Sequence, residues 1–241
     1  DELMFTPSDS FSLSFTGFDI PMDETNIISQ AYRQMENFVS NKNEHYNINI
    51  KKNIPISAGL GGGSSNAAST LKTLNKLWNC NLNNSKLAEL AVSLGADVPF
   101  FVNGKVQFAE GIGDNLSPIN PQFLLGKYIL LVVPDFNVST EWAYREVKKV
   151  LTPLKEVPKL VSFTSPVKWQ LFENDFELVI RSTYPEIDNI KTLLQQQGAL
   201  FAGLSGSGST LFGIFDNLDI AKNASSKFSH LQTICTSPVL T

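Results

Sequence analysis

The sequence has very few residues that bind metals or form covalent cross-links. Among its 241 residues there are two cysteines, Cys80 and Cys235, and two histidines. Neither cysteine belongs to a CxxC pair or has a neighbouring pair of histidines, so the pattern predicts neither a zinc site nor a disulfide framework. We interpret both thiols as incidental residues of a protein in a reducing compartment.

Long apolar runs and excess positive charge are also absent. The longest apolar run, YILLVV from Tyr128 to Val133, is far shorter than a membrane span and suits a buried strand. The net charge of −4 argues against a nucleic-acid surface, which normally makes a domain basic. We therefore expect neither nucleic acid nor a membrane as partner, and an anionic ligand would be bound locally by backbone amides and a few cations.

The sequence begins at Asp1 without a methionine, and its first residues have neither the basic nor the apolar region of a signal peptide. Because it enters directly on an alternating strand pattern, we expect the true beginning of the domain to be absent. The composition, 42% hydrophobic and 17% charged, is typical of one large or two small globular domains.

Hydrophobic periodicity predicts strands and helices that interleave without a regular βαβ repeat, which favours an α+β fold. Helical spacing is clearest at Ile27, Ala31, Met35 and Phe38, with Asp23 or Thr25 as the expected cap. Further helices are expected over residues 66–78, 83–95 (capped near Ser85), 139–151, 174–198 (two helices) and 217–228. Strands are expected over residues 11–15, 46–54, 98–119 (two short strands), 127–135, 199–215 (two strands around a glycine turn) and at the C-terminus. The polar, proline-containing stretch from Thr152 to Pro166 is the best candidate for a domain boundary.

The segment PISAGLGGGSSNAAST, from Pro55 to Thr70, is the strongest local signal. A strand runs into it and an amphipathic helix leaves it at once, a context that disfavours a flexible linker. The first amides of a helix bind anions, and glycines let a phosphate approach the backbone. No lysine stands between Lys52 and Lys72, so the loop is not a Walker A motif. We interpret it as a different kind of phosphate-binding loop.

Three ordered motifs resemble those of the GHMP kinases, a family of small-molecule kinases. They are GLGGGSSNAA, then LGADVPFF from Leu94 to Phe101, and GLSGSGSTLFGIF from Gly203 to Phe215. Together with FAEGIGD, they look most like the family members that phosphorylate 4-diphosphocytidyl-2-C-methyl-D-erythritol on the methylerythritol phosphate route to isoprenoids. The resemblance covers most of the chain from about Ile48 to Phe215.

The resemblance implies a role for each matching position. Asp97 matches the catalytic acid that takes the proton of the substrate hydroxyl. Thr140 is expected near the diphosphocytidyl group, and Tyr144 where an aromatic ring stacks on cytosine. Two groups complete the expected site: the ATP-binding loop of Pro55, Ile56, Ser57, Ala58, Gly59, Leu60, Gly61, Gly62, Gly63, Ser64 and Ser65, and the substrate-binding turn of Ser205, Gly206 and Gly208.

The resemblance also implies the two-domain α+β GHMP kinase fold. Residues 1–135 would form an ATP-binding domain like domain 2 of ribosomal protein S5, and residues 136–241 a ferredoxin-like domain. ATP and Mg²⁺ are the expected cofactors, with the metal ligands left open, and the partner is a cytidyl-diphosphate sugar alcohol. A monomer or weak homodimer is expected, in the bacterial cytoplasm or, in a eukaryote, a plastid-type organelle.

One part of the family pattern has no match. The family opens with a Pro-Ala-Lys-Ile-Asn-Leu motif, whose lysine pairs with the catalytic aspartate, and continues with a Gly-Tyr-His segment that holds the cytosine. We expect a truncated chain rather than a lineage without these segments.

Alternatives remain at several positions. Asp97 also fits a structural turn aspartate, and Tyr144 a helical core aromatic. Lys51 and Lys52 fit a solvated strand edge, or lie near ATP. For the whole chain the alternatives are another GHMP kinase, acting on homoserine or a mevalonate derivative, and a nucleotide-binding protein without kinase activity.

Overall fold

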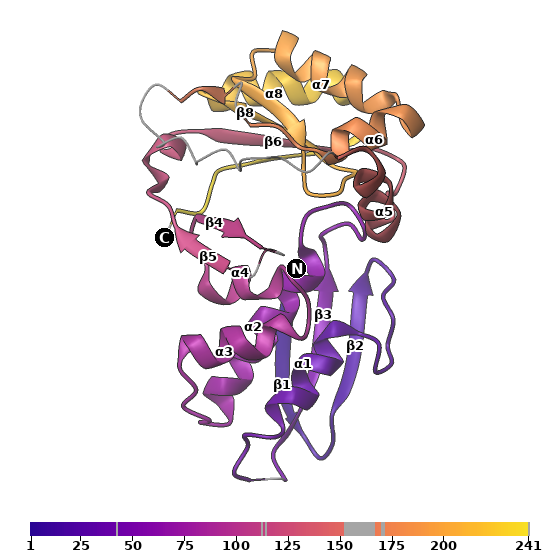
Figure 1. Cartoon of the computed structure of the whole chain (residues 1–241). Helices are drawn as coiled ribbons and strands as arrows, with labels where there is room; N and C mark the ends of the chain where they lie inside the picture. The colour runs from indigo at the N-terminus through magenta and orange to yellow at the C-terminus, as the bar shows by residue number, and fades with distance from the viewer. Residues whose placement is uncertain (42, 112, 114, 152–166, 170–171, 241) are drawn as a thin grey trace. The chain divides into compact units, whose positions relative to one another are not determined.

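The computed structural model describes residues 1–41, 43–111, 113, 115–151, 167–169 and 172–240. Its contacts divide the chain into two compact units (Figure 1). The first contains Asp1–Ile56 and Gly61–Ile119, and the second contains Ser57–Leu60 and Asn120–Leu240. The glycine loop therefore contributes to both units. The boundary candidate at 152–166 lies outside the described residues, and the division at 135/136 stays a prediction.

The first unit is a three-stranded sheet covered by helices, followed by a small hairpin. In the order β1-β3-β2, β1 pairs with β3 antiparallel and β2 pairs with β3 parallel. Its elements are β1 (Glu2–Ser8), β2 (Ser12–Gly17), α1 (Ile27–Met35), β3 (His45–Lys52), α2 (Gly62–Leu77), α3 (Asn84–Val92), α4 (Val98–Asn103), β4 (Gln107–Glu110) and β5 (Asn115–Pro118). Ile48 and Ile50 of β3 are buried in one core with Leu71 and Leu74 of α2.

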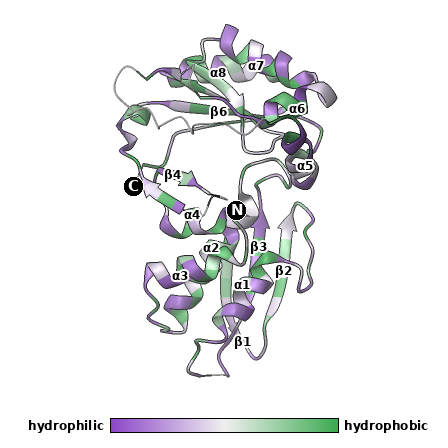
Figure 2. Cartoon of the chain, in the orientation of Figure 1, coloured by the Kyte–Doolittle hydropathy of each residue, from purple (hydrophilic) through white to green (hydrophobic). Residues whose placement is uncertain are grey.

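The caps of two helices differ from those expected. Asn26, not Asp23 or Thr25, caps α1, because its side-chain oxygen accepts a bond from Ile28 N at 2.9 Å. Asn83, rather than Ser85, caps α3 by accepting from Lys86 N at 2.9 Å. Sequence alone did not separate these caps because several Asn, Asp, Ser and Thr residues stand near each helix start. Figure 2 shows hydrophobic and hydrophilic residues along both α1 and α3, as expected for helices with one buried face.

The segment that follows α3, residues 98–119, also differs in part from expectation. Residues 98–119 do contain two short strands, β4 and β5, but the VPFFVN part forms helix α4, where only strands and loops were expected. Pro99 lies in the first turn of α4, where its missing N–H costs no hydrogen bond. Gly104, with φ +66°, ends the helix. Of the FAEGIGD motif, Ile112 and Asp114 lie outside the described residues.

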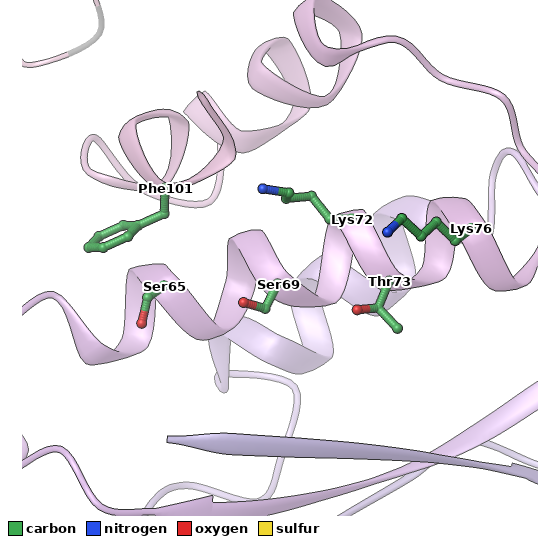
Figure 3. A pocket seen from close by; sticks show the side chains of 6 residues that line it. All are labelled: Ser65, Ser69, Lys72, Thr73, Lys76 and Phe101. Carbon is green, nitrogen blue, oxygen red and sulfur yellow. The ribbon is translucent and has the colours of Figure 1, made fainter. Parts of the chain in front are cut away.

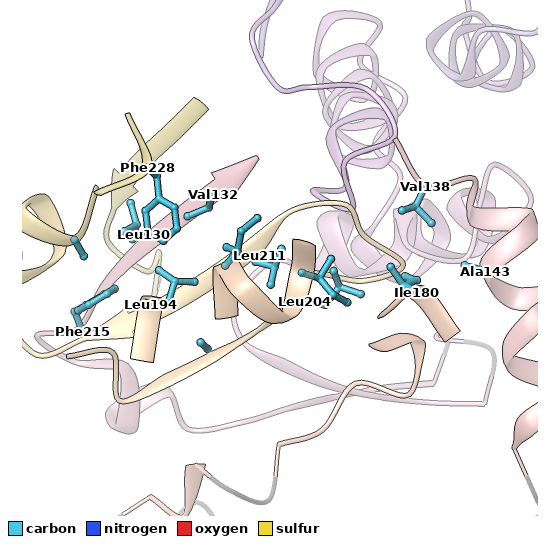
Figure 4. Close-up of a cluster of buried hydrophobic side chains, with 14 of the residues drawn as sticks. Leu130, Val132, Val138, Ala143, Ile180, Leu194, Leu204, Leu211, Phe215 and Phe228 are labelled. Carbon is cyan, nitrogen blue, oxygen red and sulfur yellow. The ribbon is translucent and has the colours of Figure 1, made fainter. Parts of the chain in front are cut away.

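The second unit is a four-stranded sheet of order β7-β8-β6-β9 with antiparallel neighbours. Its elements are η1 (Pro121–Leu124), β6 (Tyr128–Val133), α5 (Thr140–Val150), α6 (Phe176–Thr183), α7 (Glu186–Gln196), β7 (Phe201–Leu204), β8 (Leu211–Phe215), α8 (Leu218–Ser225), η3 (Ser226–Phe228) and β9 (Gln232–Thr236). The YILLVV run is β6, a central strand as predicted. In Figure 4, Leu130 and Val132 of this strand belong to a cluster that extends to Val138 and Ile180.

Among the helices that the structure describes, none is both long enough and apolar enough to cross a membrane.

Candidate functional site

Helix α2 begins inside the glycine loop with an uncapped N-terminus. Gly61 occupies the N-cap position in the left-handed region, φ +64°, and makes no side-chain capping bond. No acidic residue lies in the first turn, and the first amide with a backbone acceptor there is that of Ser65, which donates to Gly61 O at 2.9 Å. The amides before it have no acceptor within the helix. This end of α2 therefore offers backbone N–H groups and a favourable dipole to an anion.

Gly61 and Gly62 have little space for a side chain. A Cβ on Gly61 would lie 2.7 Å from the ring of Phe101, and one on Gly62 would lie 2.9 Å from Ile54 and 3.0 Å from Lys52 Nζ. The start of the helix is thus packed closely against its own unit. A larger residue at either position would displace the start of the helix.

Lys52 lies buried beneath this helix start, not on a solvated strand edge. Its side chain is 5% exposed, and its Nζ donates to the Asp1 carboxylate and to Ile54 O, both at 2.7 Å. The Asp1 side chain is 1% exposed and also accepts from Asn66 Nδ2 at 2.8 Å and from the amides of Asn53 and Ile54. Burial lowers the pKa of the Lys52 ammonium from its ordinary value.

From the sequence, Lys52 was expected at a solvated strand edge or near ATP, and Asp1 was not singled out. Their pair fixes the chain at Ile54, directly before the glycine loop. Lys51, its neighbour, is exposed and pairs with exposed Glu2, but β3 is the central strand of its sheet, so Lys51 lies on a solvated sheet face and not at a strand edge. The alternation of buried and exposed positions along β3 was the available signal for the difference.

The first half of the glycine loop is bonded to the second glycine motif, within the second unit. Thr210 N donates to Ala58 O at 3.1 Å, and Ser205 Oγ donates to Gly59 O at 2.8 Å. Gly59 has φ +73°, and a Cβ there would lie 2.1 Å from Ser205 O. The two glycine motifs, 146 residues apart in sequence, therefore form one continuous structure at this point.

The second glycine motif is a tight turn between β7 and β8. Gly206 and Gly208 both have positive φ, and Ser205 N and Thr210 O close the turn with a 2.8 Å bond. The nearest neighbours of a Cβ on Gly208 are the side chains of Leu204, Ile180 and Val138, at 3.3–3.5 Å. Figure 4 shows these three side chains near one another in the cluster. The hydrophobic core of the second unit thus supports the turn.

Asp97 lies in the first unit at the N-cap position of α4. Its side chain is exposed and makes no capping hydrogen bond, so it does not fulfil the structural role of a helix-capping aspartate. Among the residues that the structure describes, none bonds to the Asp97 carboxylate, so it can act on a ligand, as the catalytic assignment requires.

Thr140 and Tyr144 lie on α5 in the second unit. The hydroxyl groups of Thr140 and Ser207 are 3.0 Å apart, which joins the start of α5 to the second glycine turn. The Tyr144 side chain is 52% exposed, so it is not the helical core aromatic that the sequence left open. Its ring packs edge-on against Phe176, with centroids 4.9 Å apart.

An open cavity of about 280 Å³ runs along α2 from its first turn. Its lining residues are Ser65, Ser69, Lys72, Thr73, Lys76 and Phe101. Figure 3 shows the Lys72 side chain extending toward α4, and its Nζ donates to Val102 O at 3.3 Å. Within the described residues, no carboxylate pairs with Lys72 or Lys76. These two cations, which were not singled out from the sequence, add positive charge along the cavity, in the second half of α2.

Two family models match this chain. Residues 26–105 match the GHMP kinases N terminal domain, and residues 167–231 match the GHMP kinases C terminal model.

Curated bacterial proteins match over almost the whole chain. A 4-diphosphocytidyl-2-C-methyl-D-erythritol kinase of Prosthecochloris aestuarii is 39% identical over 237 residues, which cover 95% of this chain and 81% of that protein. The protein of the same name from Chlorobium chlorochromatii is 39% identical over 90% of this chain and 76% of its own length.

Solved structures are similar as well. A crystal structure of 4-(cytidine 5'-diphospho)-2C-methyl-D-erythritol kinase has a TM-score of 0.76 and 29% identity, covering 97% of this chain and 84% of that one. Homoserine kinase from Cytophaga hutchinsonii has a TM-score of 0.75 at 18% identity, covering 98% and 85%, and this likeness concerns the fold alone.

Proposed function

This chain belongs to the GHMP kinase family, and from that premise we propose that it transfers the γ-phosphate of ATP to the 2-hydroxyl of 4-diphosphocytidyl-2-C-methyl-D-erythritol. The α+β GHMP kinase fold expected from the motifs is confirmed. The choice of substrate is supported by relatives 39% identical that have this activity in their names. Because those relatives are bacterial, we place the reaction in the bacterial cytoplasm as part of the methylerythritol phosphate route.

The observation that carries the proposal is the uncapped N-terminus of α2 within a glycine loop. We assign the loop from Pro55 to Ser65 to the ATP phosphates, because its amides and the α2 dipole stabilise the charge on them. Phosphoryl transfer depends mainly on positioning and on charge stabilisation, which this geometry supplies.

Asp97 is assigned as the general base. Its carboxylate takes the proton of the substrate 2-hydroxyl while that oxygen bonds to the γ-phosphorus and the bond to the ADP oxygen breaks. The products are ADP and the phosphorylated alcohol. We assign Thr140 to the diphosphocytidyl group, Tyr144 to stacking on cytosine, and the Ser205, Gly206 and Gly208 turn to the phosphate and polyol region. The half-exposed ring of Tyr144 is suited to such stacking.

The residues assigned to this site fit a Mg²⁺ ion that binds together with ATP. In the part of the chain that the structure describes, no three His, Cys, Asp or Glu side chains form a cluster that would hold a metal on its own. Mg²⁺ commonly binds through substrate phosphates and one or two protein oxygens. The Ser64 hydroxyl and the Asp97 carboxylate have the right oxygen chemistry, and the bound ion would neutralise phosphate charge.

The direct test is a phosphorylation assay of the purified protein with ATP, Mg²⁺ and a panel of alcohols. The expected result is ADP formation with 4-diphosphocytidyl-2-C-methyl-D-erythritol at a kcat/KM far above that for homoserine or mevalonate. Preference for one of the other alcohols would identify a different GHMP kinase. ATP binding without ADP formation on any alcohol would support the nucleotide-binding alternative.

Lys72 and Lys76, which line the cavity along α2, are expected to strengthen ATP binding through their positive charge. The double variant K72M/K76M should raise the Kd for ATP about fivefold at low salt, equivalent to about 1 kcal/mol for two exposed charges. The difference should shrink as salt increases, because exposed charges are screened. Titration calorimetry at two ionic strengths measures both effects.

The matched control is K222M/K227M, which removes the same net charge from the second unit. We expect its Kd for ATP to equal that of the wild type. If both double variants raised the Kd for ATP equally, the cause would be the net charge of the protein and not the position of Lys72 and Lys76 in the cavity.

Gly59 is expected to tolerate no side chain. The G59A variant should raise the Kd for ATP at least tenfold, because its Cβ would lie 2.1 Å from Ser205 O and would push the loop off the second glycine turn. G126A is the matched control: Gly126 has φ +68°, and none of the described residues other than its chain neighbours lies within 4 Å of a Cβ built there. In both variants the alanine must adopt a left-handed backbone conformation, which costs about 1–2 kcal/mol. Only in G59A does its Cβ also clash with another backbone atom, Ser205 O. Similar ATP affinities for the two variants would contradict the prediction.

A further inference from the structure

Asn174, two residues before the first residue of α6, bonds to three backbone groups at once. Its side-chain Nδ2 donates to Leu204 O at 2.9 Å and to Gly206 O at 2.8 Å, and its Oδ1 accepts from Phe176 N at 3.0 Å. The first two bonds pin carbonyls at the start of the second glycine turn, and the third stabilises the start of α6. One side chain thus joins the turn to the helix.

Glu177, in the first turn of α6, holds the same segment from the core. Its side chain is 9% exposed and accepts from Leu204 N at 3.0 Å and from Lys191 Nζ at 2.5 Å. Leu204 is therefore bound through its N–H by Glu177 and through its C=O by Asn174. The orientation of the backbone at the end of β7 is therefore fixed by Glu177 of α6 and by Asn174 just before that helix.

Such bracing matters because the turn itself is made of flexible residues. Glycine loses more conformational freedom on folding than other residues, so Gly206 and Gly208 need external bonds to hold one backbone geometry. The peptide between Gly206 and Ser207 is planar and trans, so its N–H points opposite to its C=O. With Gly206 O held by Asn174, the Ser207 N–H is directed to the other side of the turn.

The same short segment also contacts Tyr144, the ring that is expected to stack on cytosine. Phe176, two residues after Asn174, packs edge-on against Tyr144 with an interplanar angle of 81°. The residues from Asn174 to Glu177 therefore contact both features of the second unit that are assigned to substrate, the glycine turn and the aromatic ring.

We propose that Asn174 is a positioning residue of the kinase: it fixes the Gly206–Ser207 peptide so that the turn presents its amide to the phosphate and polyol region of the substrate. The proposal rests on the proposed function of this turn and adds a residue that acts through it. Asn174 need not touch substrate, and its effect should be on the reaction step more than on nucleotide binding.

The N174D variant separates the two roles of the side chain. A carboxylate can still accept from Phe176 N, and its charge is favourable at a helix start, so α6 should remain folded. It cannot donate to Leu204 O or Gly206 O, and its oxygens face those carbonyls. N174S is a second variant, because a hydroxyl can also accept from Phe176 N but is too short to replace both donors. N189D, on the exposed face of α7, is the matched control for the added charge.

We expect kcat with 4-diphosphocytidyl-2-C-methyl-D-erythritol to fall at least tenfold in N174D and in N174S, with the Kd for ATP within twofold of wild type. Amide hydrogen exchange of residues 203–210 should become about tenfold faster in both variants, since local opening governs exchange. N189D should leave both quantities unchanged.

A folded N174D or N174S with kcat within twofold of wild type overturns the proposal. So does a loss of activity that a matching loss of folded protein fully explains, because that is a structural role alone. If the wild-type protein phosphorylates none of the alcohols, the proposed function fails. Amide exchange then tests the role of Asn174 without an activity assay. If residues 203–210 exchange at the wild-type rate in N174D and N174S, Asn174 does not hold the turn.

Discussion

The Asp97→Asn variant is expected to lower kcat by a factor of about 10²–10⁴, the usual contribution of a general base, while the Kd for ATP stays within twofold. Asparagine has nearly the same shape as aspartate but does not take up the proton of the substrate hydroxyl. Because the Asp97 side chain is exposed and makes no capping bond, the fold does not depend on its charge. Steady-state kinetics and ATP titration on the same preparation measure the two quantities.

Asp219 provides the control for this variant. It is an exposed aspartate in the first turn of α8, so D219N removes the same charge from a helix start in the other unit. We expect D219N to have wild-type kcat. A D97N enzyme with more than a tenth of wild-type kcat would contradict the assignment of Asp97 as base and would favour the turn-aspartate interpretation.

The parts of the site that sequence predicts are those governed by local rules. A glycine-rich stretch followed by helical periodicity places the start of α2, and the apolar positions Ala67, Leu71, Leu74 and Trp78 are all buried as their spacing predicts. The pattern of the YILLVV run likewise places β6 at the centre of its sheet. In each case the signal and the structure it describes lie within about 15 residues.

The parts that sequence missed depend on partners far along the chain. The alternation along β3 places Lys52 on the buried face, but its buried partner Asp1 is 51 residues away, and no local pattern encodes that pair. Ser205 is predicted to bind substrate, yet its hydroxyl also donates to Gly59 O, a contact that no local pattern encodes. Asn174 lies two residues before α6, where a local bond to Phe176 N is predictable but its two bonds to the glycine turn are not.

The K52M variant is expected to lower the free energy of unfolding by about 3–5 kcal/mol, the usual cost of removing one partner of a buried ion pair. The Asp1 carboxylate would keep its bonds to Asn66 and to two backbone amides but would have no opposite charge. Ile54 O would also lose its ammonium donor. Because Ile54 directly precedes the glycine loop, ATP affinity should fall together with stability. Urea denaturation and ATP titration test the two effects.

K51M is the matched control one residue earlier, because the pair of Lys51 with Glu2 is exposed to solvent. Solvent screens that pair, so K51M should unfold at nearly the same urea concentration as the wild type. The double variant D1N/K52M supplies the second comparison: it removes the uncompensated charge together with its partner and should recover much of the stability lost in K52M. Equal stability of K52M and K51M would mean that the buried pair does not hold the chain before the loop. A double variant no more stable than K52M would mean that packing of the lysine side chain, rather than its charge, does so.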